Sequence, residues 1–174
     1  SAFVTVDGYK FVSGTDAIAA AKDGSAYIID VRSSNAQTKT GTLKGSISQS
    51  LFDDNNKLDT AEAEALENAF KEKIPSIITE DKPIYIICNS GARGARAAAV
   101  LLRRAGYDTS RIHTITGGAT GLEVRYAFLG TSNAVTGAEA VAAVDSNDVV
   151  IVDVRTKENF ANGHLKNSLS LLSE

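Results

Sequence analysis

The fold of this chain is decided by residues 84–107, which read IYIICNSGARGARAAAVLLRRAGY. A short apolar run comes first, and a glycine-containing turn follows. An alanine-rich segment then extends to Gly106, and glycine commonly ends helices. An apolar run that leads through a tight turn into a helix is typical of a buried parallel strand. The sequence therefore predicts a strand over 83–88 and a helix over 92–105, with Cys88 at the end of the strand.

The same alternation of strand and helix signals continues on both sides of this stretch. Asp59 is the expected N-cap of one helix, with Glu62 three positions further on. Strands separated by helices require crossover connections, so the predicted fold class is α/β with a central, mostly parallel sheet flanked by helices. The additional elements are strands over 26–31 and 112–116 and helices over 15–22, 59–73 and 120–129.

A repeat divides the chain into two parts. Residues 12–32 (VSGTDAIAAAKDGSAYIIDVR) align without a gap to residues 135–155 (VTGAEAVAAVDSNDVVIVDVR), and nine of the 21 pairs are identical. The match resumes with GTLKGSIS at 41–48 against GHLKNSLS at 163–170. We therefore expect a complete domain over 1–132, and residues 133–174 as the truncated start of a second repeat without a counterpart of the Cys88 segment.

Composition limits the class of protein. An apolar content of 43% in 174 residues is enough for a real core, and no run of about 18 uncharged apolar residues predicts a membrane span. The net charge of −3 argues against a broad nucleic-acid surface. Because the sequence holds no methionine, Ser1 is not a retained translation start, so we expect a processed or excised chain, and the compartment, cytoplasmic or exported, stays open.

The second repeat contains an apolar run that is predicted to be a strand and therefore needs a strand to pair with. Its apolar run VVIVDV, residues 149–154, predicts a strand with no visible sheet of its own. An exposed apolar strand tends to pair with another chain. We therefore expect residues 133–174 either to dock on their own domain or to swap with a second copy in a homodimer.

Cys88 is the candidate reactive residue. A single cysteine can form neither an intramolecular disulfide nor a structural zinc site, and the alternative reading is a buried inert thiol. Ligands of parallel sheets gather at the carboxyl ends of strands, and the glycine-containing loop before a helix can direct several N–H groups at one anion. Such a field favours the nucleophilic thiolate. The expected site is catalytic Cys88 with the binding residues Asn89, Ser90, Gly91, Ala92, Arg93 and Gly94.

The remaining polar residues have structural explanations. Asp30 and Arg32, at the end of a predicted strand, are expected to form a structural ion pair. His113 is expected to be a hydrogen-bonded strand residue, and neither it nor His164 predicts a metal site. No G-x-S-x-G motif surrounds Ser90, which argues against a hydrolase nucleophile. The charged helix face carries Arg96, Arg103 and Arg104, of which Arg96 lies one turn from Arg93.

Three motifs together resemble the rhodanese family. CNSGARGARAA, beginning at Cys88, resembles its active-site loop, IIDVR at 28–32 resembles its first strand motif, and TGGATGLE at 116–123 resembles its Gly-Gly segment. The resemblance implies a three-layer fold and sulfur transfer. Cys88 would take a sulfane sulfur from a small donor such as thiosulfate, become a persulfide, and pass the sulfur to cyanide or a thiol, without a metal or organic cofactor.

Two alternatives to a sulfurtransferase remain. A rhodanese-like module can also serve as a sulfur carrier or a protein-binding regulator with little turnover, which the departure from the family pattern at residues 35–42 keeps open. Leu122 stands where the family commonly has tryptophan. Related cysteine phosphatases hold five residues between cysteine and arginine, whereas four residues lie between Cys88 and Arg93, so the shorter loop favours one sulfur atom over a phosphate.

Overall fold

The computed structural model describes residues 8–123 and 135–171. The chain divides into two compact units, a first unit of Ser1–Ala134 and a second unit of Val135–Glu174. The domain boundary expected at 132/133 from the repeat stays a prediction. Among the described residues, no helix combines the length and the apolar character needed to cross a lipid bilayer.

A five-stranded sheet forms the centre of the first unit, and every pair in it is parallel. The α/β prediction with a mostly parallel sheet is therefore confirmed. Two of its strands, at the two edges, were not expected from the sequence because two or three residues give no readable alternation of side chains. The strand order is β1 (Lys10–Val12), β5 (Ile112–Ile115), β4 (Ile84–Ile87), β2 (Tyr27–Asp30) and β3 (Ile47–Ser48).

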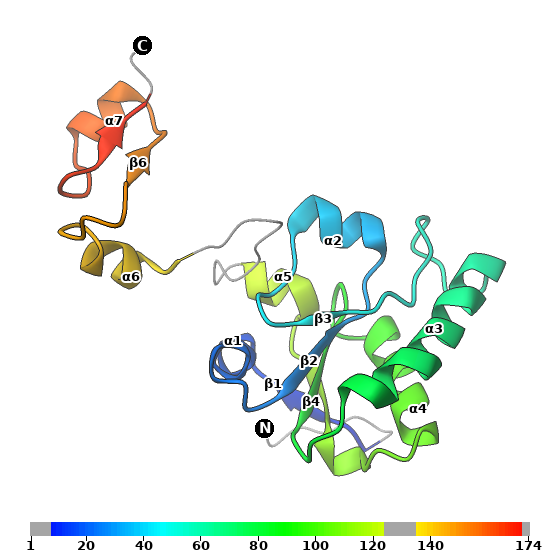
Figure 1. Ribbon diagram of the computed structural model, residues 1–174. Coiled ribbons are helices and arrows are strands. Elements are labelled where there is room, and N and C mark those ends of the chain that lie inside the picture. The colour runs from blue at the N-terminus through cyan, green and yellow to red at the C-terminus, as the bar shows by residue number, and fades with distance from the viewer. Residues whose placement is uncertain (1–7, 124–134, 172–174) are drawn as a thin grey trace. The chain divides into compact units, whose positions relative to one another are not determined.

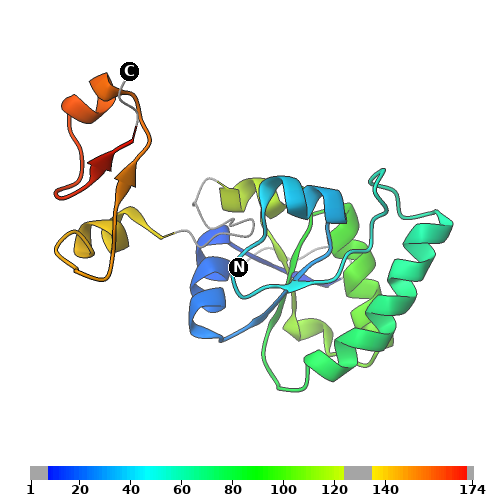
Figure 2. The same ribbon diagram turned by 45° about the horizontal axis from the view of Figure 1, so that its top comes forward.

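Helices cover both faces of this sheet and produce three layers (Figures 1 and 2). On one face, α1 (Gly14–Asp23) and α5 (Gly118–Glu123) close a core with residues such as Ile28 and Ile115. On the other face, α3 (Ala61–Ile77) and α4 (Arg93–Arg104) close a larger core. The connections also contain α2 (Ser34–Thr40) and a 3₁₀ turn at Thr109–Arg111.

The start of α3 differs from the expectation. Asp59 was predicted as its N-cap, but Thr60 is the cap, with its hydroxyl accepting from the Ala63 amide at 3.2 Å. The hydroxyl also donates to Asp53 at 2.7 Å, so a contact from outside the helix selects Thr60 over its neighbour. The helix runs past the expected end at 73 and includes Pro75.

The helix expected over 15–22 is confirmed as α1, and the two remaining helix expectations have different outcomes. The end of α4 follows the prediction, because Gly106 takes a left-handed φ of 98° and its amide bonds the Arg103 carbonyl at 2.9 Å. The amide of Tyr107 bonds the Leu102 carbonyl at 3.1 Å, which completes a Schellman motif. The helix expected over 120–129 begins earlier, at Gly118, and its part beyond 123 lies outside the described residues.

The second unit repeats the opening elements of the first. Its β6–β7 pair is parallel, and the register Val152↔Leu169 corresponds to Ile29↔Ile47 in the first unit. Equivalent hydroxyls cap equivalent helices, since Ser13 and Thr136 each accept an amide bond at 3.1 Å. Its elements are α6 (Gly137–Ala142), β6 (Val152–Asp153), α7 (Lys157–Ala161) and β7 (Leu169–Ser170).

Candidate active site

Cys88 lies directly after β4 and five residues before α4 begins, at the carboxyl edge of the sheet. The residue is 2% exposed and belongs to the larger core, where Leu51 and Ala95 are also buried. Its sulfur is nevertheless in polar contact, because the Gly91 N–H donates to Sγ at 3.0 Å. The thiol is thus covered by the loop that follows it and receives an amide from that loop.

The turn after β5 holds the loop in place. Gly91 has a φ of 86°, and a Cβ added to it would lie 2.8 Å from the Ile115 carbonyl oxygen. A Cβ on Gly118, whose φ is 54°, would collide with the Cys88 carbonyl oxygen. The Ala119 amide donates to that same oxygen at 2.8 Å. Close approach of two backbones, which only glycine permits, therefore explains the glycines at Gly91 and Gly118.

The first turn of α4 lies under a buried aromatic ring. A Cβ added to Gly94 would be 2.5 Å from Phe52 Cε2 and 2.9 Å from Cys88 Cβ. Gly94 is consequently the residue that lets the helix start, the ring and the cysteine pack together. The sequence grouped Gly94 with the binding loop, and this binding role stays a prediction beside the packing role.

Arg93 is held at the mouth of the loop by Asn56. Its Nη2 donates to the Asn56 carbonyl at 2.9 Å, and its guanidinium lies 5.0 Å over the Phe52 ring. Asn89 Nδ2 donates to Asn56 Oδ1 at 3.5 Å. The backbone of Asn56 is left-handed, with a φ of 60°. Sequence reasoning missed Asn56, although an asparagine in the polar turn DDNNK at 53–57 is the residue type that tolerates this conformation.

A buried carboxylate organises the turn that presents Asn56. Asp53 accepts from the amides of Asn55 and Lys57, both at 2.9 Å, and from the Thr60 hydroxyl at 2.7 Å. The bond from Thr60 and the amide of Lys57 lower the pKa of Asp53 below its ordinary value. Asp53 therefore stays ionised over the physiological range and ties the turn to the start of α3.

A cleft of about 780 Å³ adjoins the outer side of the loop. Its lining begins at residues 91–93 and continues along α4 through Arg96, Val100 and Arg104, with Glu67 on α3. The volume is typical of sites for small molecules. Arg96 and Arg104, expected on a solvated helix face, thus border a cleft. Among its described lining residues, cationic side chains outnumber the one acidic side chain, Glu67.

The other predicted site residues are divided between the rim and the strands. Asn89, Ser90 and Ala92 are exposed at the loop surface. His113 is half-buried on β5, and its Nδ1 lies 2.9 Å from the Arg111 carbonyl oxygen. Burial lowers the pKa of His113. His164 belongs to the second unit, where its Nδ1 lies 2.8 Å from the Phe160 carbonyl oxygen.

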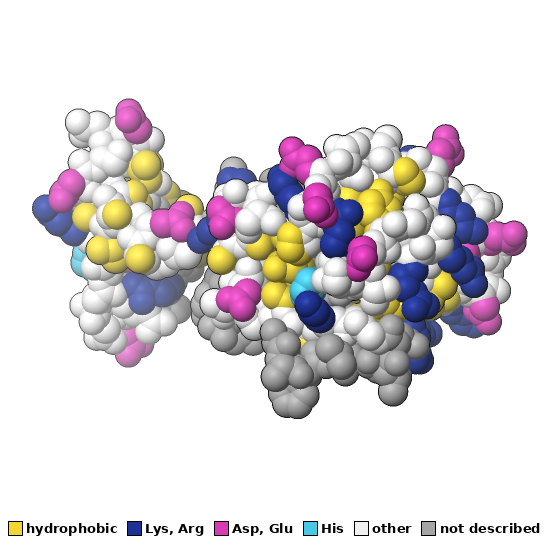
Figure 3. All heavy atoms as spheres, turned by 90° about the horizontal axis from the view of Figure 1, so that it is seen from below, with side chains coloured by type: hydrophobic (Ala, Val, Ile, Leu, Met, Phe, Trp, Pro, Cys, Tyr) yellow, Lys and Arg dark blue, Asp and Glu magenta, His cyan; other side chains and the backbone are white. Residues whose placement is uncertain are grey.

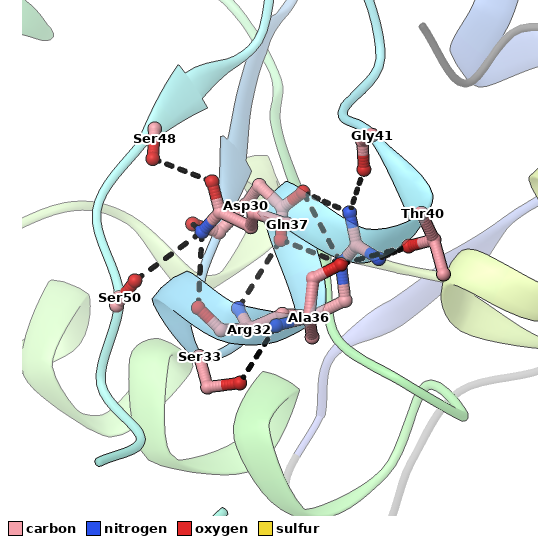
Figure 4. A network of polar contacts seen from close by, with 9 residues as sticks. All are labelled: Asp30, Arg32, Ser33, Ala36, Gln37, Thr40, Gly41, Ser48 and Ser50. Carbon is pink, nitrogen blue, oxygen red and sulfur yellow. Dashed lines mark hydrogen bonds and ion pairs between the residues drawn. The ribbon is translucent and has the colours of Figure 1, made fainter. Parts of the chain in front are cut away.

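Asp30 and Arg32 form a buried ion pair at the end of β2, 2.7 Å apart and 0% and 1% exposed. Figure 4 shows Arg32 reaching the Thr40 hydroxyl at 2.7 Å and the Gly41 carbonyl, while Gln37 Nε2 donates to the Arg32 carbonyl at 3.0 Å. The pair closes the connection from β2 through α2. Since Asp30 stands opposite Ile87 in the sheet, this network supports the strand end that precedes Cys88.

Comparison with known proteins gives one family. The rhodanese-like domain matches residues 13–123 and 136–174. A search of curated proteins found no match.

Similar solved structures come from several organisms. Reduced CoADR-RHD of Bacillus anthracis is 26% identical over 69% of this chain, with a TM-score of 0.48, and the match spans only 18% of that chain. A rhodanese-related protein of Thermoplasma volcanium is 22% identical over 67% of this chain and 93% of that one, with a TM-score of 0.46. Ygr203w of Saccharomyces cerevisiae, a homolog of single-domain rhodanese and of the Cdc25 phosphatase catalytic domain, is 20% identical over 68% and 82%, with a TM-score of 0.47.

Proposed function

Because the chain belongs to the rhodanese-like domain family, we propose that it is a sulfurtransferase, which moves a sulfane sulfur from a donor such as thiosulfate to a thiophilic acceptor through a persulfide of Cys88. The observation that carries the proposal is the Gly91 amide directed at Cys88 Sγ, 3.0 Å away, in the loop between β4 and α4. An amide and a helix N-terminus both stabilise negative charge on sulfur.

The reaction consists of two displacements at sulfur. The Cys88 thiolate attacks the outer sulfur of thiosulfate, a new S–S bond forms, and sulfite leaves with the electron pair of the broken S–S bond. Cyanide or a thiolate then attacks the terminal sulfur of the persulfide, and the Cys88 thiolate leaves. Covalent storage of the sulfur divides the transfer into two easier steps and predicts ping-pong kinetics.

The positions of Arg93 and the cleft support donor and acceptor binding beside the loop. Arg93 is exposed and held by the Asn56 carbonyl, so its guanidinium brings positive charge to the mouth of the site. The sulfonate end of thiosulfate would enter there, since arginine readily pairs with oxyanions. The cleft along Arg96 and Arg104 leaves room for an acceptor larger than cyanide.

The burial of Cys88 favours one alternative within the same family. At 2% exposure, a persulfide on Cys88 would be shielded from solvent, and exchange with small molecules would require the loop to open. A sulfur carrier with low turnover, or a regulatory module, would have these properties. The two functions differ in the rate of the second step, which is fast for an enzyme and slow for a carrier.

Mass spectrometry of the intact chain after incubation with thiosulfate tests the proposal. We expect the intact mass to rise by one sulfur atom, about 32 Da, and digestion to locate it on the peptide that contains Cys88. Cys88→Ser should show no such increase. Ser76→Ala, a change at an exposed position of α3 outside the Cys88 loop, is the matched control and should retain the added sulfur. An unmodified thiol that still reacts with an alkylating agent would contradict the sulfurtransferase and the carrier alike.

Steady-state turnover then separates the candidates. Rapid thiocyanate formation from thiosulfate and cyanide supports the enzyme, whereas a stable persulfide without turnover supports the carrier. A phosphatase would instead hydrolyse para-nitrophenyl phosphate in a Cys88-dependent way, which we do not expect with four residues between Cys88 and Arg93.

A further inference from the structure

The cleft beside the Cys88 loop extends along one face of α4. Two neighbouring rows of that helix line it, and within each row the residues follow at intervals of four positions, which places them on one face. The rows are Arg93, Ala97 and Leu101, and Arg96, Val100 and Arg104. Arg93 and Arg104 are 11 positions apart, which corresponds to about 16 Å along the helix axis. The cleft is therefore longer than thiosulfate or cyanide.

The middle of the cleft is apolar. Besides the rows of α4, the described lining includes apolar side chains from β1, from the segment between β3 and α3, and from α3 itself. These are Phe11, Leu51, Leu58 and Ala63. Figure 3 shows Lys and Arg side chains on the part of the first unit that holds α3 and α4, with hydrophobic side chains among them. Phe11 and Val100 are half-buried, and the exposed part of such side chains favours contact with a hydrocarbon chain over contact with water.

Positive charge lies at both ends of the cleft. Arg93 is at the Cys88 loop, and Arg104 is in the last turn of α4, where its side chain is exposed. Glu67 is the acidic residue of the described lining, and it already has a partner, because Lys71 Nζ lies 3.2 Å from its carboxylate. The cleft therefore has an excess of positive charge, which complements an anionic group on a ligand.

Gly91 connects the cleft with the reactive sulfur. Its N–H donates to Cys88 Sγ at 3.0 Å, and the same residue lines the cleft. A group bound at this end of the cleft thus lies against the loop that covers the sulfur. Arg104 lines the other end, so one elongated ligand would contact the loop with one end and a cation with the other.

We infer that the cleft binds the sulfur acceptor, and that this acceptor is a thiol on an extended apolar chain that ends in a carboxylate. Arg104 is then the residue that determines specificity, because it pairs with the carboxylate while the thiol reaches the Cys88 loop. An extended chain advances about 1.2 Å per bond, so a chain of about ten carbons spans the cleft.

The inference rests on the proposed sulfur transfer and specifies its second step. The acceptor thiolate attacks the terminal sulfur of the Cys88 persulfide, and a new S–S bond forms on the acceptor. The old S–S bond breaks, and the Cys88 thiolate leaves with its electron pair. The acceptor leaves the cleft as a persulfide.

Transfer of sulfur from persulfide-loaded protein to two series of thiols tests the inference. Mercaptoacetate, 6-mercaptohexanoate and 11-mercaptoundecanoate are compared with the mercapto alcohols of the same lengths. We expect the second-order rate constant to be highest for 11-mercaptoundecanoate, about tenfold above both 11-mercaptoundecanol and mercaptoacetate. This comparison uses the wild-type chain, so it does not depend on the folding of a variant.

Variants at the end of α4 test the role of Arg104. Arg104→Gln should lower the rate constant for 11-mercaptoundecanoate about tenfold, to that of the alcohol, whereas Arg104→Lys keeps the charge and should lose less. Arg103→Gln is the matched control, since Arg103 shares the last turn of α4 and its favourable position for a cation, yet does not belong to the described lining. This variant should transfer sulfur at the wild-type rate.

Binding of undecanoate, which has the chain and the carboxylate but no thiol, gives a readout that needs no sulfur transfer. In titration calorimetry with Cys88→Ser we expect one molecule per chain, and about tenfold weaker binding when Arg104→Gln is added. No binding, several equal sites, or the same loss with Arg103→Gln would overturn the inference. Equal rates for acids and alcohols in a chain that loads its persulfide would overturn the acceptor alone. A chain that takes up no sulfur from thiosulfate contradicts the proposed function, and the acceptor with it.

Discussion

Gly94 is a residue at which side-chain packing beside Cys88 leaves no room for a Cβ. Because a Cβ there would lie 2.5 Å from Phe52 Cε2, Gly94→Ala must displace the ring or the start of α4. Overpacking of this kind costs about 1–3 kcal/mol of unfolding free energy. We expect Gly94→Ala to lower the urea midpoint and to slow persulfide formation at the adjacent Cys88.

The matched control is Gly137→Ala, at the first residue of α6. No atom lies within 4 Å of a Cβ at this position, so the change should be tolerated. Equal unfolding midpoints for the two variants would show that the Phe52 ring moves freely, and would contradict the packing role of Gly94.

Asn56 determines the position of Arg93 through its backbone rather than its side chain. Alanine at a φ of 60° is strained by about 1–2 kcal/mol, so Asn56→Ala should move the carbonyl that binds Arg93. We expect KM for thiosulfate to rise about fivefold with little change in kcat. Asn56→Gly accepts the same φ and should restore a KM near that of wild type. If glycine and alanine behave alike in steady-state kinetics, the backbone explanation is wrong.

At the scale of elements, the same Asp–Arg pair follows β2 in the first unit and β6 in the second. Its contribution to stability can therefore be compared in a buried and in an exposed setting. Asp30→Ala leaves the Arg32 guanidinium buried without its carboxylate, which typically costs about 3–5 kcal/mol. Asp153→Ala breaks the same contact where Arg155 is half exposed to water, and should change stability little. Urea denaturation of both variants measures the difference. Similar losses would mean that burial does not decide the strength of the pair.

The stability contributed by the turn between β3 and α3 should depend on pH, because this turn contains Asp53. The folded state holds the pKa of Asp53 below 3.8, chiefly through the Thr60 hydroxyl, so the ionised carboxylate stabilises the fold above that value. This stabilisation is lost as pH falls through the lower pKa of the folded state. Asp53→Asn should therefore show a shallower loss of stability than wild type as pH falls below the ordinary pKa of an aspartate, in acid titrations followed by circular dichroism. Asp54→Asn, at an exposed neighbour, should follow the wild-type curve.

At the scale of the whole molecule, the two units contribute unequally to stability. Every buried apolar side chain of the described residues belongs to the first unit, whereas eight of the nine exposed large apolar residues lie in the second. A chain ending at Ala134 should therefore keep its thermal midpoint within about 2 °C and retain the Cys88 persulfide. Calorimetry and mass spectrometry check both. A large fall in the midpoint would show that the second unit stabilises the first.

Local patterns in the sequence determined three strands, one helix and the repeat of this protein. The strands over 26–31, 83–88 and 112–116, the helix over 92–105 and its end at Gly106 could be predicted because apolar runs, helical spacing and glycine caps depend on neighbours in the chain. The parallel arrangement of the strands could be predicted because helices separate them along the chain. The repeat could be recognised by aligning the sequence with itself. The position of Cys88 at a strand end followed from the same local signals.

Only the tertiary structure decided what surrounds Cys88. The Arg93–Asn56 bond joins residues 37 apart. Gly118, which follows β5, approaches the carbonyl of Cys88, which follows the neighbouring strand β4. Thr60 replaced Asp59 as the cap because Asp53 folds back onto it. Such contacts depend on how distant segments pack in three dimensions, and no local spacing of residue types encodes that packing.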